Sequence, residues 1–232
     1  MTSRNAATLV SAMEVRKRFV SGHIEVQALR GVNLMIAEGE FVALVGPSGS
    51  GKTTLLNLIG ALDTPTSGRL EVLGHPLAAL SKSERAELRL KELGFVFQAY
   101  NLVPVLTAVE NVEFVLELQG HGIERRKMAL DILHDVDLAE FANRRPSELS
   151  GGQQQRVAVA RAVVSKPRLV LADEPTANLD GENAESLMRL MLSLRDKYRM
   201  TFLFSTHDSR VVSHAKRIVT LTDGVISKDE VR

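Results

Sequence analysis

The chain of 232 residues contains no cysteine and no tryptophan. The absence of cysteine excludes disulfides, thiolate catalysis and zinc-thiolate sites. The six histidines are scattered along the chain and show no metal-ligand spacing. Stability must therefore come from a packed core, which a chain of this length with 44% apolar residues can build.

Long apolar runs and an excess of charge of one sign are also missing. The longest unbroken apolar run covers residues 41–45, whereas a membrane-spanning helix needs about 20 such residues. Residues 1–10 lack the long apolar stretch of a secretory signal. The 29 basic and 28 acidic residues nearly cancel, and eight phenylalanines and two tyrosines are the only aromatic residues. We therefore expect a cytoplasmic protein with no nucleic-acid partner.

Short apolar runs alternate with stretches of helical periodicity. The runs at 41–45, 169–172 and 202–204 are continuous, which is typical of strands buried on both faces of a parallel sheet. Apolar residues then recur at helical spacing after the second run, at Leu187, Leu190, Met191 and Leu194. The alternation of strand and helix predicts an α/β fold.

The two ends of the chain differ from its middle. Residues 9–15 and 24–36 read as extended segments and predict an antiparallel β flank, whereas the middle of the chain is mostly helical in pattern. No Gly/Ser linker separates the parts, so we expect one domain. A mostly helical insertion at 101–148 should interrupt the α/β core and pack against it.

The clearest motif is a phosphate-binding loop, whose pattern is matched in full by Gly46, Pro47, Ser48, Gly49, Ser50, Gly51, Lys52 and Thr53. A buried strand precedes it and an apolar helix follows it, as the motif requires. Glycines let backbone N–H groups turn toward phosphate oxygens, and the helix adds its positive end. Lys52 can reach the β- and γ-phosphates, the Thr53 hydroxyl can hold Mg²⁺, and Thr54 offers one more donor.

Two adjacent carboxylates predict the other half of a nucleotide site. Asp173 ends the strand at 169–172, where an open α/β sheet places its ligands, and can hold Mg²⁺ through a water. Glu174 comes next and can polarise a water aimed at the γ-phosphate. The alternative for Glu174 is a solvated loop acid. Its position beside Asp173, with Pro175 stiffening the exit, favours catalysis.

A second anion-binding pattern occurs at Leu149–Arg156. The Ser150 hydroxyl, the N–H groups of Gly151 and Gly152 and the start of a helix come together there. An ordinary helix cap is the alternative for this segment. The chain thus has two different phosphate-binding segments. They can bind one ligand together within a single copy, or between two copies.

In this ordered set of motifs the chain resembles the nucleotide-binding subunits of ABC transporters, over about residues 12–227. The segment at 149–153 has the form of the family's LSGGQ signature. Further matches in the family's order are Phe19 at the adenine-stacking position, Gln98 of the Q-loop, Asn178, Leu179 and Asp180 of the D-loop, and the switch histidine His207.

The resemblance implies a P-loop NTPase fold in one domain. Its RecA-like core with an antiparallel β flank would cover about 9–99 and 165–227, and an inserted helical subdomain would cover about 100–164. It also implies that two copies pair head to tail around two ATP molecules. Each ATP would lie between the phosphate loop of one copy and the signature of the other, at Ser150, Gly151, Gly152 and Gln153. With every hydrolytic residue of the family present, the resemblance implies an active ATPase that uses Mg²⁺.

The resemblance also implies a role for each matching residue. Glu174 would be the general base, and His207 would contact the γ-phosphate and orient Glu174. Gln98 would contact Mg²⁺ or water and sense the γ-phosphate. Asp180 would act across the dimer. Phe19 would stack on adenine, although it could equally anchor the N-terminal flank in the core.

One branch of the family is more similar than the others. Residues 60–68, 145–152 and 171–176 resemble the ATPases of lipoprotein release, macrolide export and FtsE-type cell-division systems. Such subunits work with a separate integral-membrane permease, so this chain would be peripheral on the inner face of the cell membrane. We expect the permease to dock around residues 98–106, with one or two of the apolar side chains there exposed.

Three functions are compatible with these residues. The first is an ATPase that powers export or lipid extraction. The second is a regulatory ATPase that activates a cell-wall enzyme through the permease without moving a substrate. The third, a soluble relative acting on DNA, predicts long coiled-coil or zinc insertions, which the sequence lacks.

Overall fold

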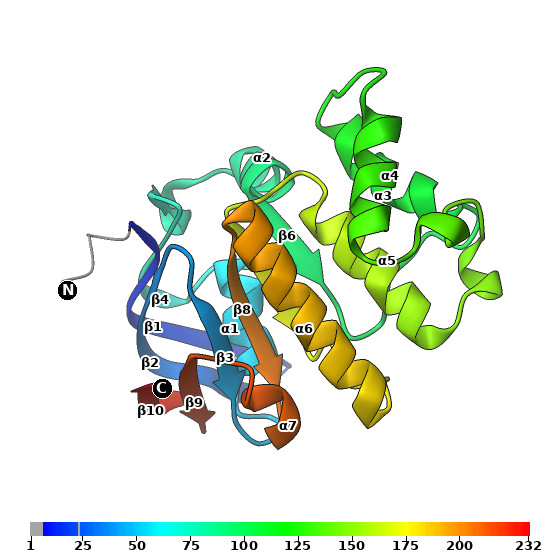
Figure 1. The fold of residues 1–232 in the computed structure, drawn as a ribbon. Helices are drawn as coiled ribbons and strands as arrows, with labels where there is room; N and C mark the ends of the chain where they lie inside the picture. Colours follow the sequence, from blue (N-terminus) through cyan, green and yellow to red (C-terminus); the bar gives the residue numbers. More distant parts are fainter. Residues whose placement is uncertain (1–6, 23) are drawn as a thin grey trace, which may run out of the picture.

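The computed structural model describes residues 7–22 and 24–232 and contains two β-sheets with helices around them (Figure 1). The larger sheet has the strand order β10-β9-β3-β8-β7-β6. Its strands are β3 (Phe41–Val45), β6 (Leu93–Val96), β7 (Leu169–Asp173), β8 (Thr201–Thr206), β9 (Arg217–Thr222) and β10 (Val225–Val231). All neighbours in it are parallel except β9 and β10. The predicted α/β fold class is confirmed.

The strands of the larger sheet are buried on both faces. Phe41 and Ala43 of β3 belong to the apolar cluster on the α5 and α6 side. Val42 and Leu44, which point the other way, belong to the cluster on the α1 side. This alternation follows from the two-residue period of a strand. It explains why the sequence shows continuous apolar runs at these strands.

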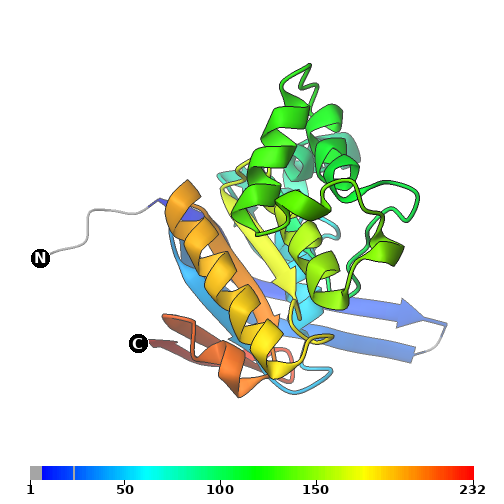
Figure 2. The same ribbon diagram turned by 45° about the vertical axis from the view of Figure 1, so that its right-hand side comes forward.

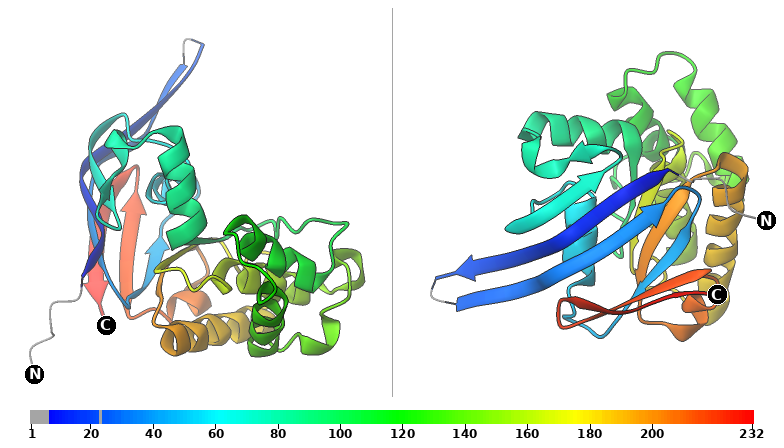
Figure 3. Two further views of the ribbon diagram at one scale, coloured as in Figure 1. Left: turned by 90° about the horizontal axis from the view of Figure 1, so that it is seen from above. Right: turned by 90° about the vertical axis from the view of Figure 1, so that its left-hand side faces the viewer.

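The smaller sheet is antiparallel in the order β2-β1-β4-β5 and is the predicted β flank. Its strands are β1 (Thr8–Ser21), β2 (Ile24–Ala37), β4 (Ser67–Val72) and β5 (His75–Pro76). The pairing of β1 with β2 continues past the extended segments predicted from sequence, and these two strands project beyond the body of the molecule (Figure 3). Helix α1 (Lys52–Ile59) packs between the two sheets.

The remaining helices cover the larger sheet and extend to one side of it. Helix α6 (Gly181–Tyr198) lies across one face, with the predicted apolar stripe buried. Between β6 and β7 the chain forms a group of helices beside the sheet (Figure 2). This helical group comprises α3 (Ala108–Leu118), α4 (Arg125–Asp135), the short turns η2 (Ala139–Phe141) and η3 (Pro146–Glu148), and α5 (Gly151–Val163).

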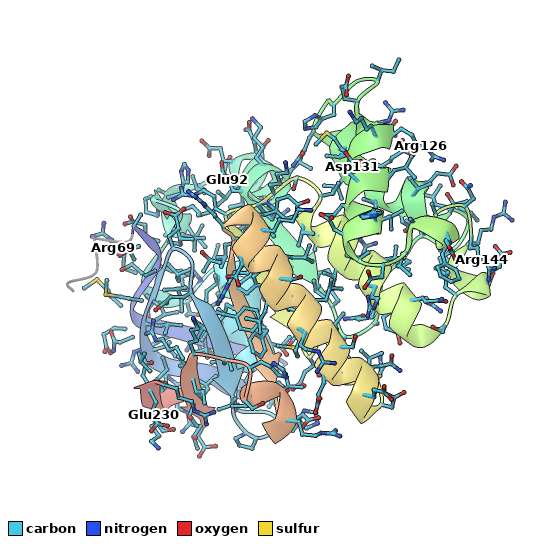
Figure 4. The ribbon with its side chains drawn as sticks, in the orientation of Figure 1. Arg69, Glu92, Arg126, Asp131, Arg144 and Glu230 are labelled. Atoms are coloured by element: carbon cyan, nitrogen blue, oxygen red, sulfur yellow. The ribbon has the colours of Figure 1, made fainter. Side chains whose placement is uncertain are left out.

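Charged side chains cover the outside of the helical group, among them Arg126, Asp131 and Arg144 (Figure 4). The elements not yet introduced are η1 (Leu77–Ala79), α2 (Lys82–Glu92) and α7 (Ser209–Val212). Within the described part of the chain, every helix is too short or too polar to cross a membrane.

Candidate functional site

The predicted site residues follow parallel strands and therefore meet at one edge of the larger sheet. The phosphate loop follows β3, Gln98 follows β6, Asp173 ends β7, and His207 follows β8. A cavity of about 700 Å³ opens at this edge. It is lined by nine of the predicted residues, namely Ser48, Gly49, Gly51, Lys52, Thr53, Thr54, Gln98, Glu174 and His207.

The phosphate loop places the ammonium group of Lys52 at the start of helix α1. Gly51 has a φ of +104°, and a Cβ there would meet the Ala28 carbonyl oxygen at 2.6 Å, so only glycine fits. Helix α1 begins without a side-chain cap. The Lys52 ammonium donates to the carbonyls of Gly46 at 2.8 Å and Pro47 at 3.1 Å. An uncapped helix start with an adjacent ammonium suits a phosphate. Gly46, Pro47 and Ser50 of the loop are not part of the cavity wall, and Ser50 is buried.

Glu174 and His207 form a pair inside the cavity. Nδ1 of His207 lies 2.9 Å from Oε2 of Glu174. The Glu174 side chain is mostly buried, whereas that of His207 is mostly exposed. Nδ1 of His207 faces the carboxylate, and Nε2 is left for a second partner. The pair has the geometry of a general base held by an orienting histidine.

Ser205 joins the two adjacent carboxylates of the site. Its hydroxyl donates to Oδ1 of Asp173 at 2.6 Å and accepts from the Glu174 N–H at 2.8 Å. Glu174 has a φ of 48°, in the left-handed region that a non-glycine residue rarely adopts. The bond from the Glu174 N–H to Ser205 therefore supports a strained backbone at the predicted catalytic carboxylate. Sequence analysis does not identify Ser205, although a hydroxyl residue in a buried strand, two positions before His207, was a usable signal.

Three side chains offer donors that fit Mg²⁺: Thr53 and Gln98 line the cavity, whereas Asp173 precedes Glu174 and is not part of the cavity wall. Thr53 offers an exposed hydroxyl, Asp173 a half-buried carboxylate and Gln98 an exposed amide. These are the hard oxygen ligands that Mg²⁺ prefers, together with phosphate oxygens of its substrate. Across residues 7–22 and 24–232, no three His, Cys, Asp or Glu side chains are grouped so that they could hold a metal ion.

The predicted signature and D-loop residues lie outside this cavity, namely Ser150, Gly151, Gly152, Gln153 and Asp180. Ser150 caps α5 through a reciprocal pair of bonds with Gln153, at 2.9 and 3.3 Å. Asp180 caps α6, and the N–H of Asn183 holds the pKa of its carboxyl below the ordinary value. Both segments are thus the starts of helices, and neither lines the cavity that contains the chain's own phosphate loop.

Phe19 lies beside the cavity rather than in its wall. It pairs across the β1–β2 ladder with Val26, which does line the cavity. Its side chain is 45% exposed, and the Lys17 ammonium lies 5.0 Å from the ring centroid. The ring is therefore available on the rim for a planar partner.

Sequence analysis also misses several residues that line the cavity, namely Gln27, Ala28 and Arg30 of β2, Ala177, and the turn at Asp223 and Gly224. Of these, only the turn at Asp223 and Gly224 could be predicted from the sequence, because Asp-Gly is a frequent turn dipeptide. The Asn178 amide donates to the Gln98 carbonyl at 2.9 Å. This bond links the predicted D-loop to the predicted Q-loop within one chain.

The family model described as ABC transporter matches residues 29–177, which is more than half of the chain. The chain belongs to the ABC transporter family. As an ABC cassette it binds adenine nucleotide and is an ATPase.

Relatives of this ABC cassette agree with the branch suggested by its sequence. It is 46% identical over 226 residues to the lipoprotein-releasing system ATP-binding protein LolD of Anaeromyxobacter dehalogenans, covering 97% of this chain and 95% of that protein. It is 45% identical over 224 residues to the macrolide export ATP-binding/permease protein MacB of Syntrophobacter fumaroxidans, covering 95% of this chain. This chain spans only 31% of that longer protein.

The fold of the cassette matches a solved structure closely. A dimer of the ATP-binding cassette MJ0796 of Methanocaldococcus jannaschii, bound to ADP and Pi in a post-hydrolysis state, superposes with a TM-score of 0.89. The match covers 96% of this chain and 98% of that chain, at 44% sequence identity.

Replacing Ser205 by alanine tests the bridge between Asp173 and Glu174. Because the change leaves both partners without their bond, we expect the free energy of unfolding to fall by about 1–3 kcal/mol. We also expect ATP turnover to fall about ten-fold through misplacement of Glu174, with nucleotide affinity nearly unchanged. Steady-state kinetics and denaturant unfolding measure the two effects.

The control for Ser205→Ala is Ser193→Ala, which removes a hydroxyl that bonds only the Leu190 carbonyl of α6. This variant should keep its kcat. Equal kcat values for Ser205→Ala and the wild-type cassette would show that the bridge has no part in catalysis.

Proposed function

We propose that this chain is the ATP-hydrolysing subunit of a membrane ABC system, that it pairs head to tail with a second copy, and that it drives a separate permease. One observation supports the proposed head-to-tail pairing of two copies. The cavity that contains Lys52 and Glu174 is not closed by the helix start at Ser150, which lies outside its wall. The helix start at Ser150 of a second copy would close this cavity.

In the proposed reaction the Glu174 carboxylate takes a proton from the water that attacks the γ-phosphate. With both ring nitrogens protonated, His207 would donate from Nδ1 to that carboxylate and from Nε2 to the same phosphate. Lys52 and the N–H groups at the start of α1 offset the charge of the β- and γ-phosphates. Thr53, Gln98 and Asp173 would hold Mg²⁺, which supplies further charge neutralisation at the phosphate oxygens when bound.

The second copy would complete the site with its Ser150 hydroxyl, the N–H groups of Gly151 and Gly152, and Gln153. Asp180 would contact the partner across the interface, and Phe19 would stack on adenine at the cavity rim. The dimeric state of the solved cassette MJ0796 with ADP and Pi supports this arrangement. A symmetric pair of identical chains is also the commonest closed assembly.

The permease partner is supported by the names of the relatives, one of which is an ATP-binding/permease protein and another part of a lipoprotein-releasing system. We infer a peripheral position on the inner face of the membrane, and a role in export or lipid release. The core would cover about residues 9–99 and 165–227, and the helical subdomain about 100–164. Within the expected docking segment 98–106, Val105 is 73% exposed.

A matched pair of helix-cap variants tests the composite site. Ser150 caps α5 and Ser81 caps α2, each through the same reciprocal capping box. Replacing either by alanine should cost about 1 kcal/mol of stability. Only Ser150→Ala should also lower ATP turnover and ATP-dependent dimerisation, because only Ser150 would face the partner's nucleotide.

Nucleotide affinity of the isolated monomer should stay unchanged in both variants, because neither serine lines the chain's own cavity. Light scattering with ATP and Mg²⁺ measures the dimer, and binding of a fluorescent nucleotide measures affinity. If Ser150→Ala and Ser81→Ala had the same ATPase activity, the signature would be no more than a helix cap and the pairing proposal would fail.

A further inference from the structure

The side chain of Gln155, on α5, holds the loop that carries Glu174. Gln155 is 1% exposed, and its Nε2 donates to the Pro175 carbonyl at 2.7 Å. Pro175 is itself buried and directly follows Glu174. No other N–H group in residues 7–22 and 24–232 donates to that carbonyl. The Gln155 amide therefore fixes the backbone one residue beyond the predicted general base.

Glu174 thus lies between two hydrogen bonds that come from different elements. On one side its own N–H donates to the Ser205 hydroxyl of β8 at 2.8 Å. On the other side Pro175 has no N–H, so its carbonyl is the one backbone group by which a neighbour can hold it. A residue with the left-handed φ of Glu174, 48°, keeps that conformation only when its surroundings hold it. Gln155 supplies the part of that support that comes from the helical group.

The other end of the Gln155 amide gains nothing for stability. Its Oε1 is buried, and no described residue donates a hydrogen bond to it. A buried acceptor without a donor costs free energy, as does a buried carbonyl that loses its donor. A methionine at this position would remove the first cost and introduce the second, and it would fill nearly the same volume. The stability of the fold is therefore a poor reason for glutamine at this position.

Building on the proposed role of Glu174 as general base, we propose that Gln155 is a positioning residue for ATP hydrolysis. Its amide holds the Pro175 carbonyl and thereby directs the Glu174 carboxylate toward the attacking water. Gln155 does not line the nucleotide cavity, so it acts through the backbone of Glu174 and not on the nucleotide. Its loss should slow the chemical step without weakening ATP binding.

Gln155→Met removes the amide and keeps the length of the side chain. We expect the kcat of the full-length cassette to fall about ten-fold, with KM for ATP and nucleotide affinity unchanged within about two-fold. Because the two free-energy terms at this position oppose each other, the melting temperature should shift by no more than about 4 °C. Gln155→Asn, whose amide is one carbon shorter, should lower kcat in the same way and serves as the second variant.

The matched control is Gln119→Met. Nε2 of Gln119, at the end of α3, also donates to a backbone carbonyl of another helix, that of Leu90 in α2, at 2.6 Å. This bond joins two elements that lie outside the wall of the nucleotide cavity. The control should keep the kcat and KM of the wild-type cassette. An equal fall in kcat for Gln119→Met and Gln155→Met would overturn the proposal, because any lost amide–carbonyl bond would then have this effect.

A double-mutant cycle with Glu174→Gln tests whether Gln155 acts through Glu174. Once the base is absent its direction no longer matters, so Gln155→Met should slow single-turnover hydrolysis by less than about two-fold in that background. A further ten-fold loss there would show that Gln155 acts by another route.

The outcomes separate this inference from the function on which it rests. A wild-type kcat for both Gln155 variants, or a joint loss of nucleotide affinity and thermal stability in both, would overturn the positioning role and leave the proposed function standing. Turnover of Glu174→Gln at the wild-type rate would instead remove the general base on which both depend.

Discussion

Replacing Glu174 by glutamine is expected to lower ATP turnover by about 10²- to 10⁴-fold, the usual contribution of a general base. Glutamine keeps the size of the side chain and can still bond His207, but its amide cannot accept a proton from water. Nucleotide affinity should be retained. With hydrolysis blocked, the proposed head-to-tail dimer should accumulate in ATP and Mg²⁺, and light scattering would detect it.

The control for Glu174→Gln is Glu140→Gln, the same change at an exposed position in η2. It should leave both turnover and the monomer–dimer balance as they are. Turnover of Glu174→Gln at the wild-type rate would mean that a different group activates the water. Slow turnover of Glu174→Gln without a dimer would agree with Glu174 as the general base but would contradict the proposed head-to-tail pairing.

Replacing Lys52 by alanine is expected to weaken nucleotide binding itself. The ammonium is the one side-chain cation that the phosphate loop places at the start of α1. Charged hydrogen bonds of this kind contribute about 1.5–3 kcal/mol, so the dissociation constant should rise about 10- to 150-fold. Titration with a fluorescent ATP analogue measures this change.

Lys52 also bonds the carbonyls of Gly46 and Pro47, so its loss could loosen the loop even without nucleotide. Thermal unfolding of the nucleotide-free variant separates that effect from lost phosphate contact. The matched control is Lys127→Ala, at an exposed position on α4. An unchanged nucleotide affinity for Lys52→Ala would contradict the assignment of the phosphate loop.

The features that could be predicted from sequence are those whose physics is local. The phosphate loop depends on eight consecutive residues, 46–53, and the cap at Ser150 on a bond to a residue three positions away. The apolar stripe of α6 and the continuous runs of the buried strands also follow from short-range periodicity. These patterns therefore predict the fold class, the nucleotide chemistry and the family resemblance.

The sequence by itself thus determined which chemical groups this protein carries, whereas only the tertiary structure decided which of them meet. Ser205 bridges Asp173 and Glu174 across more than thirty residues, and Asn178 reaches Gln98 across eighty. Arg161 reaches Asn101 across sixty. Such contacts depend on strand order, register and helix placement, which hydrophobic periodicity does not specify, because many arrangements bury the same apolar faces.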